Sequence, residues 1–211
     1  MNKLPAVRDV DAMRDEGYGE INAELEHRLE RRELGPYTYR DYYALGEEGP
    51  RFQLIRGWLV REPSPFEAHQ RAVGNLYLLM RQWVDAHALG KVYLAPFDTV
   101  FSPKDIVQPD ILFVSSQRRD RITERSIQGA PDLVVEVLSR GTRNRDREVK
   151  LAIYADGGVR EAWMIDPAVE LIELHALQET GRAVRVFAGD ERIASGVLGR
   201  LPFAAHRVFE P

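Results

Sequence analysis

The stretch that decides the fold is GAPDLVVEVLSRGTRNRDREVKLAIYADGG, residues 129–158. Its segment 133–138 is short, rich in β-branched residues and apolar except at Glu136, which predicts a fully buried strand. A carboxylate in such a strand is costly unless a positive or hydrogen-bonding group meets it. A helix is predicted soon afterwards, over residues 144–156, and it carries Lys150. The buried glutamate therefore calls for a partner or a function.

Length and composition limit the class of protein. The chain has 211 residues, of which 44% are hydrophobic, enough for one domain with a full-sized core. No apolar run approaches the roughly 18 residues that a membrane span needs, and the first residues lack the apolar core of a secretion signal. We therefore expect a cytoplasmic protein with no membrane partner. The net charge of −4 gives no overall nucleic-acid signature, so a local basic surface would have to meet any polyanion.

The residue types limit the chemistry further. The chain has no cysteine, which excludes disulfides, a thiol nucleophile and thiolate metal sites. Its five histidines are scattered, with no pair at zinc spacing. Carboxylates remain as the main metal ligands, and oxygen ligands favour Mg²⁺ or Mn²⁺.

Apolar periodicity predicts an α/β sandwich around one mixed sheet. Residues 1–35 are expected to form an N-terminal helical extension and residues 36–211 a single domain. An amphipathic helix is predicted over residues 67–88. Strand patterns then follow at residues 91–95, 99–102, 107–114, 131–139, 161–166, 170–177 and 183–189, with the helix of residues 144–156 between two of them.

Two of these strands each carry one carboxylate in an apolar setting. VQPDILFV, residues 107–114, places Asp110 just after a proline, and the other carboxylate is Glu136. If the two strands pair, carboxylates that face the same way lie roughly 5 Å apart, close enough to share one divalent cation. Without a cation the two groups would repel each other and one pKa would rise.

Lys150 fits the same site. The helix is expected to turn Val149, Ala152 and Ile153 toward the sheet, with Lys150 at the edge of this stripe and outside the core. From that edge its side chain could reach across toward the cation. Two carboxylates, a divalent ion and a lysine form a unit suited to phosphodiester hydrolysis, in which the ion activates water and the lysine stabilises charge.

These motifs, VQPDILFV followed by GAPDLVVEVLSRGTRNRDREVKLAIYADGGVREAWMIDP, closely resemble the Uma-two family of restriction endonucleases, a bacterial branch of the PD-(D/E)XK superfamily. The resemblance runs from about Tyr37 to the C-terminus and implies a restriction-endonuclease-like sandwich with a mixed central sheet. It implies that Asp110 and Glu136 are the acidic metal ligands, joined by the main-chain carbonyl of Val137. The superfamily's usual lysine is absent, since Leu138 stands there; the family lysine of the following helix is matched by Lys150.

The sequence departs from the family in one motif. Members read approximately ELIDGEL where this chain reads QLIRGWL, so Gln53, Arg56 and Trp58 replace three acids. Loss of a metal-supporting acid would weaken cleavage. Two functions therefore stay open: a Mg²⁺- or Mn²⁺-dependent endonuclease acting on DNA, and a weak or inactive nuclease-fold protein that binds nucleic acid or serves as an assembly partner. A metallohydrolase of small phosphate esters is a third alternative.

Several further residues are candidates with equally good structural explanations. His69 matches a family histidine and is expected near the substrate phosphate or behind the metal ligands, unless it is a surface hydrogen-bonding residue. Asp98 and Gln53 are candidates near the site. Three arginines at the start of the second helix are candidates for contacts with the DNA backbone, although neighbouring acids suggest surface ion pairs equally well: Arg143, Arg145 and Arg147. By analogy with the superfamily, we expect a homodimer.

Overall fold

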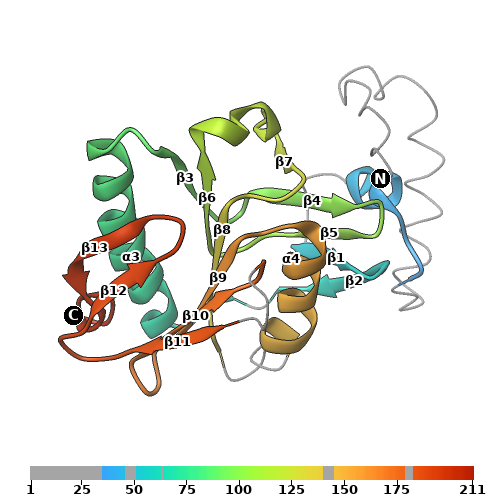
Figure 1. The fold of residues 1–211 in the computed structure, drawn as a ribbon. Helices are drawn as coiled ribbons and strands as arrows, with labels where there is room; N and C mark the ends of the chain where they lie inside the picture. Colours follow the sequence, from blue (N-terminus) through green and yellow to red (C-terminus); the bar gives the residue numbers. More distant parts are fainter. Residues whose placement is uncertain (1–34, 46–50, 63, 140–144, 179–182) are drawn as a thin grey trace. The chain divides into compact units, whose positions relative to one another are not determined.

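The computed structural model describes residues 35–45, 51–62, 64–139, 145–178 and 183–211. Within these ranges the chain is a mixed α/β protein, as predicted (Figure 1). It divides into two compact units, one formed by residues 1–62 with 102–107 and one by residues 63–101 with 108–211. The predicted N-terminal helical extension and its boundary at residue 35 lie almost entirely outside the described residues and stay predictions.

The described part of the first unit is small. A short helix, α2 (Tyr39–Ala44), begins after Thr38, whose main-chain N–H and hydroxyl both donate hydrogen bonds to the Asp41 carboxylate, at 2.7 and 2.8 Å. Three strands follow in the order β2-β1-β5, namely β1 (Phe52–Ile55), β2 (Trp58–Arg61) and β5 (Asp105–Val107). The turn between β1 and β2 uses Arg56 and Gly57 at positive φ, 52° and 83°, a conformation that suits a tight hairpin.

The second unit contains the main sheet. Its strands are β3 (Gly90–Leu94), β6 (Ile111–Ser115), β8 (Leu133–Val137), β9 (Glu161–Asp166), β10 (Leu171–Ala176) and β11 (Val184–Phe187). They lie in the order β11-β10-β9-β8-β6-β3. The pair β8–β9 is parallel, with a helical crossover between them, and the other pairs are antiparallel.

Helices lie on the two sides of this sheet (Figure 1). On one side is α3 (Glu67–Ala86), whose buried stripe Ala72, Leu76, Met80 and Val84 packs in one core with alternate residues of the strands. On the other side is α4 (Leu151–Gly157), preceded by a π-helical turn, η2 (Arg145–Lys150). The hairpin of β12 (Arg192–Ser195) and β13 (Gly199–Ala204), which the sequence analysis did not identify, and the short η3 (Ala205–Val208) add to the core of α3.

The remaining elements of this unit are a parallel pair, β4 (Asp98–Ser102) with β7 (Ser126–Gln128), and a 3₁₀ segment, η1 (Ser116–Arg121). The strand predicted over residues 107–114 is interrupted, because β5 ends at Val107 and β6 begins at Ile111. Pro109 lies in the gap; it has no N–H to donate to a sheet. No helix within the described ranges has the length and apolar character to cross a membrane.

The second helix differs from its prediction. Residues 145–150 wind as a π-helix, and only Leu151–Gly157 is an α-helix. Val149, expected on the sheet-facing stripe, is 36% exposed, whereas Lys150, expected outside the core, is only 2% exposed. A π-turn holds more residues than an α-turn and shifts the face that later residues present. The edge position of Lys150 was therefore wrong because the prediction assumed uniform α-helical spacing.

Candidate active site

Asp110 and Glu136 come together at the end of the β6–β8 pair. The antiparallel register sets Ile111 opposite Val135, so the next pair along is Asp110 opposite Glu136. This confirms that the two carboxylate-bearing strands are neighbours. At this point the Val137 N–H donates a 2.7 Å hydrogen bond to Oδ2 of Asp110. The carboxylate thus takes the place of the main-chain carbonyl that would accept this bond in a regular sheet.

The Glu136 carboxylate is buried among charged partners. It is 3% exposed, Lys150 Nζ lies 3.1 Å from both of its oxygens, and the Tyr154 hydroxyl donates a hydrogen bond to Oε1. Burial raises the pKa of Glu136 to about 8; the charge of Lys150 opposes this rise, whereas nearby Asp146 and Asp110 add to it. The carboxylate is thus held at a position where negative charge is crowded.

A column of side chains on η2 and α4 faces Glu136. Asp146, Lys150 and Tyr154 are spaced by four residues and all three are buried. Lys150 lies between two carboxylates, since its Nζ is also 3.5 Å from Oδ1 of Asp146. The sequence analysis named neither Asp146 nor Tyr154 as a site residue. Their fourfold spacing with Lys150 was the available signal.

His69 reaches the same carboxylates from the first turn of α3. Its Nε2 lies 3.3 Å from Oδ2 of Asp110, so both protein contacts of that carboxylate fall on one oxygen. Burial acts to lower the pKa of His69, but the hydrogen bond to Asp110 and the charges of Asp110 and Asp146 raise it above its ordinary value. Its Nδ1 is buried and has no hydrogen-bond partner among the described residues.

The carbonyl of Val137 points to the same edge of β8 as its N–H, because both groups of one residue in an extended strand face the same neighbour. Since that N–H meets Asp110, the carbonyl lies on the Asp110 side of the strand. Asp110, Glu136 and Val137 thus offer oxygen atoms at one place in the sheet. No group of three or more His, Asp or Glu side chains in the described ranges is arranged to hold a metal.

Comparison with known proteins identifies the family. The Uma2 family, described as "Putative restriction endonuclease", matches residues 39–201. The chain belongs to the Uma2 family. A search of curated proteins finds no match. Among solved structures, a nuclease of the DUF820 group from Anabaena variabilis, itself named as putative, superposes with a TM-score of 0.69 at 20% identity, covering 82% of this chain and 98% of that one. At this identity the likeness shows a shared fold.

The three positions at which the resemblance implies acids lie in the first unit. Gln53 is 1% exposed on β1, opposite Val60 on β2. Arg56 occupies the β1–β2 turn, where its main-chain N–H donates a 2.8 Å hydrogen bond to Asp105, and Trp58 is 54% exposed. Any role of Gln53 in supporting a metal stays a prediction.

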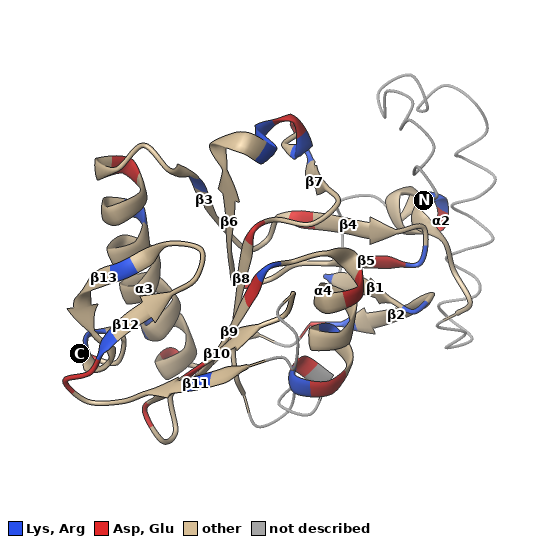
Figure 2. Cartoon of the chain, viewed as in Figure 1, with Lys and Arg blue, Asp and Glu red and all other residues tan. Residues whose placement is uncertain are grey.

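The remaining candidates, Asp98 and the three arginines, either bind other side chains of the protein or lie outside the described residues. Asp98 on β4 accepts a 2.8 Å hydrogen bond from the Gln108 amide. The Arg147 guanidinium donates two hydrogen bonds to the Glu173 carboxylate, at 2.7 and 2.8 Å. Arg143 lies outside the described residues, as does the side chain of Arg145. Figure 2 shows basic and acidic residues side by side in the turn that precedes α4. Contacts of these arginines with DNA stay predictions.

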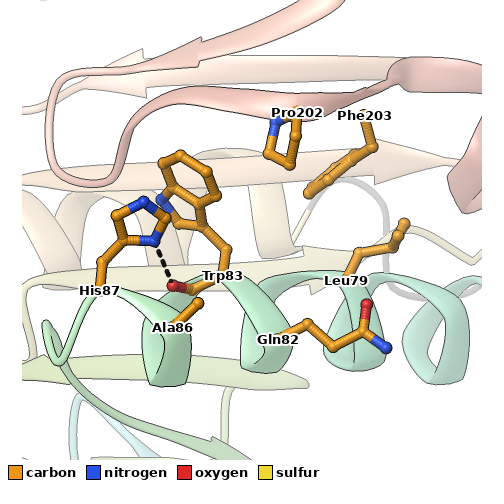
Figure 3. Close-up of a pocket in the computed structure, with 7 residues that line it drawn as sticks. All are labelled: Leu79, Gln82, Trp83, Ala86, His87, Pro202 and Phe203. Carbon is orange, nitrogen blue, oxygen red and sulfur yellow. Dashed lines mark hydrogen bonds between the residues drawn. The ribbon is translucent and has the colours of Figure 1, made fainter.

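A separate pocket lies between α3 and β13, with a volume of about 330 Å³ (Figure 3). Its lining residues are Leu79, Gln82, Trp83, Ala86, His87, Pro202 and Phe203. The His87 ring packs on the Trp83 ring, with centroids 3.7 Å apart, and its Nδ1 lies 2.9 Å from the Trp83 carbonyl oxygen. The pocket is mainly apolar and includes none of the buried carboxylates described above.

Proposed function

We propose that this protein is a divalent-metal-dependent endonuclease that hydrolyses DNA phosphodiester bonds. One observation carries the proposal: Asp110 and Glu136 face each other across β6 and β8, with a buried lysine 3.1 Å from both oxygens of Glu136. Membership of the Uma2 family supports nuclease chemistry and DNA as the substrate. Packing of the sheet would not by itself call for a buried lysine between two carboxylates, and buried charged clusters of this kind are frequent at functional sites.

The donor set fits Mg²⁺ or Mn²⁺. The Asp110 and Glu136 carboxylates and the Val137 carbonyl are hard oxygen ligands, which suit these ions better than zinc. Mg²⁺ normally keeps several waters and binds substrate phosphate, so few protein ligands suffice. When bound, such an ion lowers the pKa of water and neutralises charge on the phosphate.

The protein's own groups supply positioning and charge. Lys150, held by Glu136 and Asp146, presents a fixed ammonium group that stabilises negative charge developing on the phosphate. Tyr154 orients the Glu136 carboxylate through its hydroxyl. His69 steadies Asp110 through Nε2.

The test is cleavage of supercoiled plasmid DNA by the full chain with Mg²⁺ or Mn²⁺. Glu136→Gln keeps the shape of the side chain but removes its charge, and we expect its rate to fall by about 100-fold or more. Glu210→Gln is the matched control, because Glu210 forms ion pairs with His206 and Arg207 at the C-terminus. Chelation of the metal should abolish cleavage, and equal rates for wild type and Glu136→Gln would refute the proposal.

A weak or inactive DNA-binding protein is the second candidate. Two observations favour it: the acids of the QLIRGWL motif are absent, and Glu136 is already engaged by Lys150 and Tyr154. Retarded migration of the plasmid without nicking, in wild type and Glu136→Gln alike, would establish this alternative. The expected homodimer remains a prediction that light scattering of the full chain would test.

A further inference from the structure

The π-helical turn η2 contacts two different strands of the main sheet. Lys150, at its end, binds Glu136 on β8. Arg147, three residues earlier, binds Glu173 on β10. The strand β9 lies between β8 and β10, so the two contacts are separated by the width of two strand spacings.

The winding of η2 makes this double contact possible. Because a π-turn contains more residues than an α-turn, side chains three positions apart diverge more widely around the helix axis. This divergence directs Arg147 to β10 and Lys150 to β8. π-turns are rare and occur mostly as single turns within α-helices, so contacts with the surrounding residues must hold one in place.

The Arg147–Glu173 contact is well suited to hold the turn. Both guanidinium terminal nitrogens bind separate carboxylate oxygens, a paired geometry that fixes orientation as well as distance. The Glu173 side chain is only 19% exposed and Arg147 33% exposed, so the pair is partly shielded from water. His175 Nε2 lies 3.4 Å from Oε2 of Glu173 and limits its movement.

We propose that the Arg147–Glu173 ion pair is a positioning clamp, which holds η2 against β10 so that Lys150 is aimed at Glu136. The catalytic consequence rests on the function proposed above, whereas the structural consequence does not. Neither residue touches the candidate metal ligands, so the clamp acts through Lys150. The Arg147 guanidinium is thereby assigned to the protein rather than to DNA.

The first experiment measures the position of Lys150 without any cleavage. Amine acylation of the full chain, read by peptide mass spectrometry, gives the rate at each lysine, with exposed Lys91 as the internal reference. Glu173→Gln should raise the relative rate at Lys150 by about fivefold, the effect of losing one partly exposed ion pair on local opening. Glu210→Gln should leave the rate unchanged. Equal protection of Lys150 in wild type and Glu173→Gln would overturn the clamp.

The second experiment uses the reaction. Glu173→Gln should lower kcat with little change in KM, since the clamp orients the ammonium group and does not bind substrate. Arg147→Lys, which keeps the charge but cannot form the paired contact, should give an intermediate kcat. A Lys150 rate that rises while kcat stays at the wild-type value would remove the positioning role. If wild type cleaves no DNA, the proposed function fails and the acylation rates alone decide the clamp.

Discussion

Two buried glutamates on neighbouring strands have opposite surroundings. Glu161 on β9 is 1% exposed and accepts hydrogen bonds from the Trp163 indole N–H, the Ser195 hydroxyl and the Gly196 N–H, at 2.7, 2.5 and 2.7 Å. Glu136 on β8 is equally buried, but its partners are an ammonium group and a phenol, with two further carboxylates nearby. The first glutamate accepts its hydrogen bonds from neutral donors, with the Arg185 guanidinium 3.9 Å from its Oε2. The second lies in a cluster of competing charges.

The difference separates a structural carboxylate from a candidate catalytic one. Glu161 joins β9 to the segment that follows β12, because Ser195 in turn accepts hydrogen bonds from the main chain of Val197 and Leu198. Its donors are complete without any ligand. Glu136 shares its cationic partner, Lys150, with Asp146, and Asp110 lies nearby, so an added cation would offset the remaining negative charge. Burial alone therefore does not mark a functional carboxylate; the identity of its partners does.

The largest expected change in the free energy of unfolding follows from replacing Glu161, the structural glutamate. Glu161→Ala removes the acceptor of three donors in a buried region and should lower the free energy of unfolding by about 4 kcal/mol, because each unsatisfied group costs about 1–3 kcal/mol. Urea unfolding followed by tryptophan fluorescence measures the change. Glu161→Gln keeps one acceptor oxygen and should lose about half as much. A loss below about 1 kcal/mol in Glu161→Ala would mean that the donors find other partners.

The cluster around Glu136 should respond to paired substitutions in the absence of metal. Lys150→Met leaves two buried carboxylates without their cation and should lower the free energy of unfolding by about 3 kcal/mol. Adding Glu136→Gln removes the stranded charge and should restore most of that loss. Additive losses in the double variant, measured by the same urea titration, would show that Lys150 and Glu136 are not coupled.

Metal binding should distinguish the candidate metal site of Asp110 and Glu136 from the structural Glu161. Mn²⁺ at a hundredfold excess over its dissociation constant should stabilise the wild type by about 2.7 kcal/mol through mass action. Asp110→Asn removes one ligand charge, so its thermal shift should shrink sharply, whereas Glu161→Gln should keep the full shift. A wild type that melts at one temperature with and without Mn²⁺ would contradict the metal site.

The smallest expected effect concerns a third glutamate, Glu173 on β10, and the pH dependence of the free energy of unfolding. Burial acts to raise its pKa, but Arg147 and His175 outweigh this and lower it, so its stabilisation is present above pH 4.5 and lost as the pH falls. Burial lowers the pKa of His175 below 6.5, so protonation in the unfolded state costs stability as the pH falls through 6.5.

Acid titration of the unfolding free energy would separate these two groups. His175→Gln should flatten the plot of unfolding free energy against pH just below pH 6.5. Glu173→Gln should flatten it below pH 4.5, where the wild type loses about 1 kcal/mol with its partly exposed ion pair. Unchanged slopes in both variants would show that the pair contributes nothing to stability.

The sequence predicted the two carboxylate-bearing strands, because a charge in an apolar strand and a Pro-Asp strand start are local patterns. Their pairing was a condition of the expected site, and the structure meets that condition. The sequence did not predict the burial of Lys150, since the π-turn arises from contacts with β8 and β10 that lie far along the chain. The hydroxyl contact of Tyr154 with Glu136 was not predicted either, because it depends on the packing of α4. Arg147 was ambiguous because only the fold brings Glu173 beside it.

Both protein contacts of the Asp110 carboxylate fall on Oδ2, so its two oxygens can have different roles. Oδ2 serves the fold, through the Val137 N–H and His69, whereas Oδ1 makes no hydrogen bond or ion pair with the described residues. An asparagine that offers its amide oxygen to the Val137 N–H would keep this structural hydrogen bond. It would lose the negative charge that the proposed metal site needs. On the function proposed above, Asp110→Asn is therefore the natural choice for a substrate trap, a folded protein that binds DNA without cutting it and so reveals which sequences it binds.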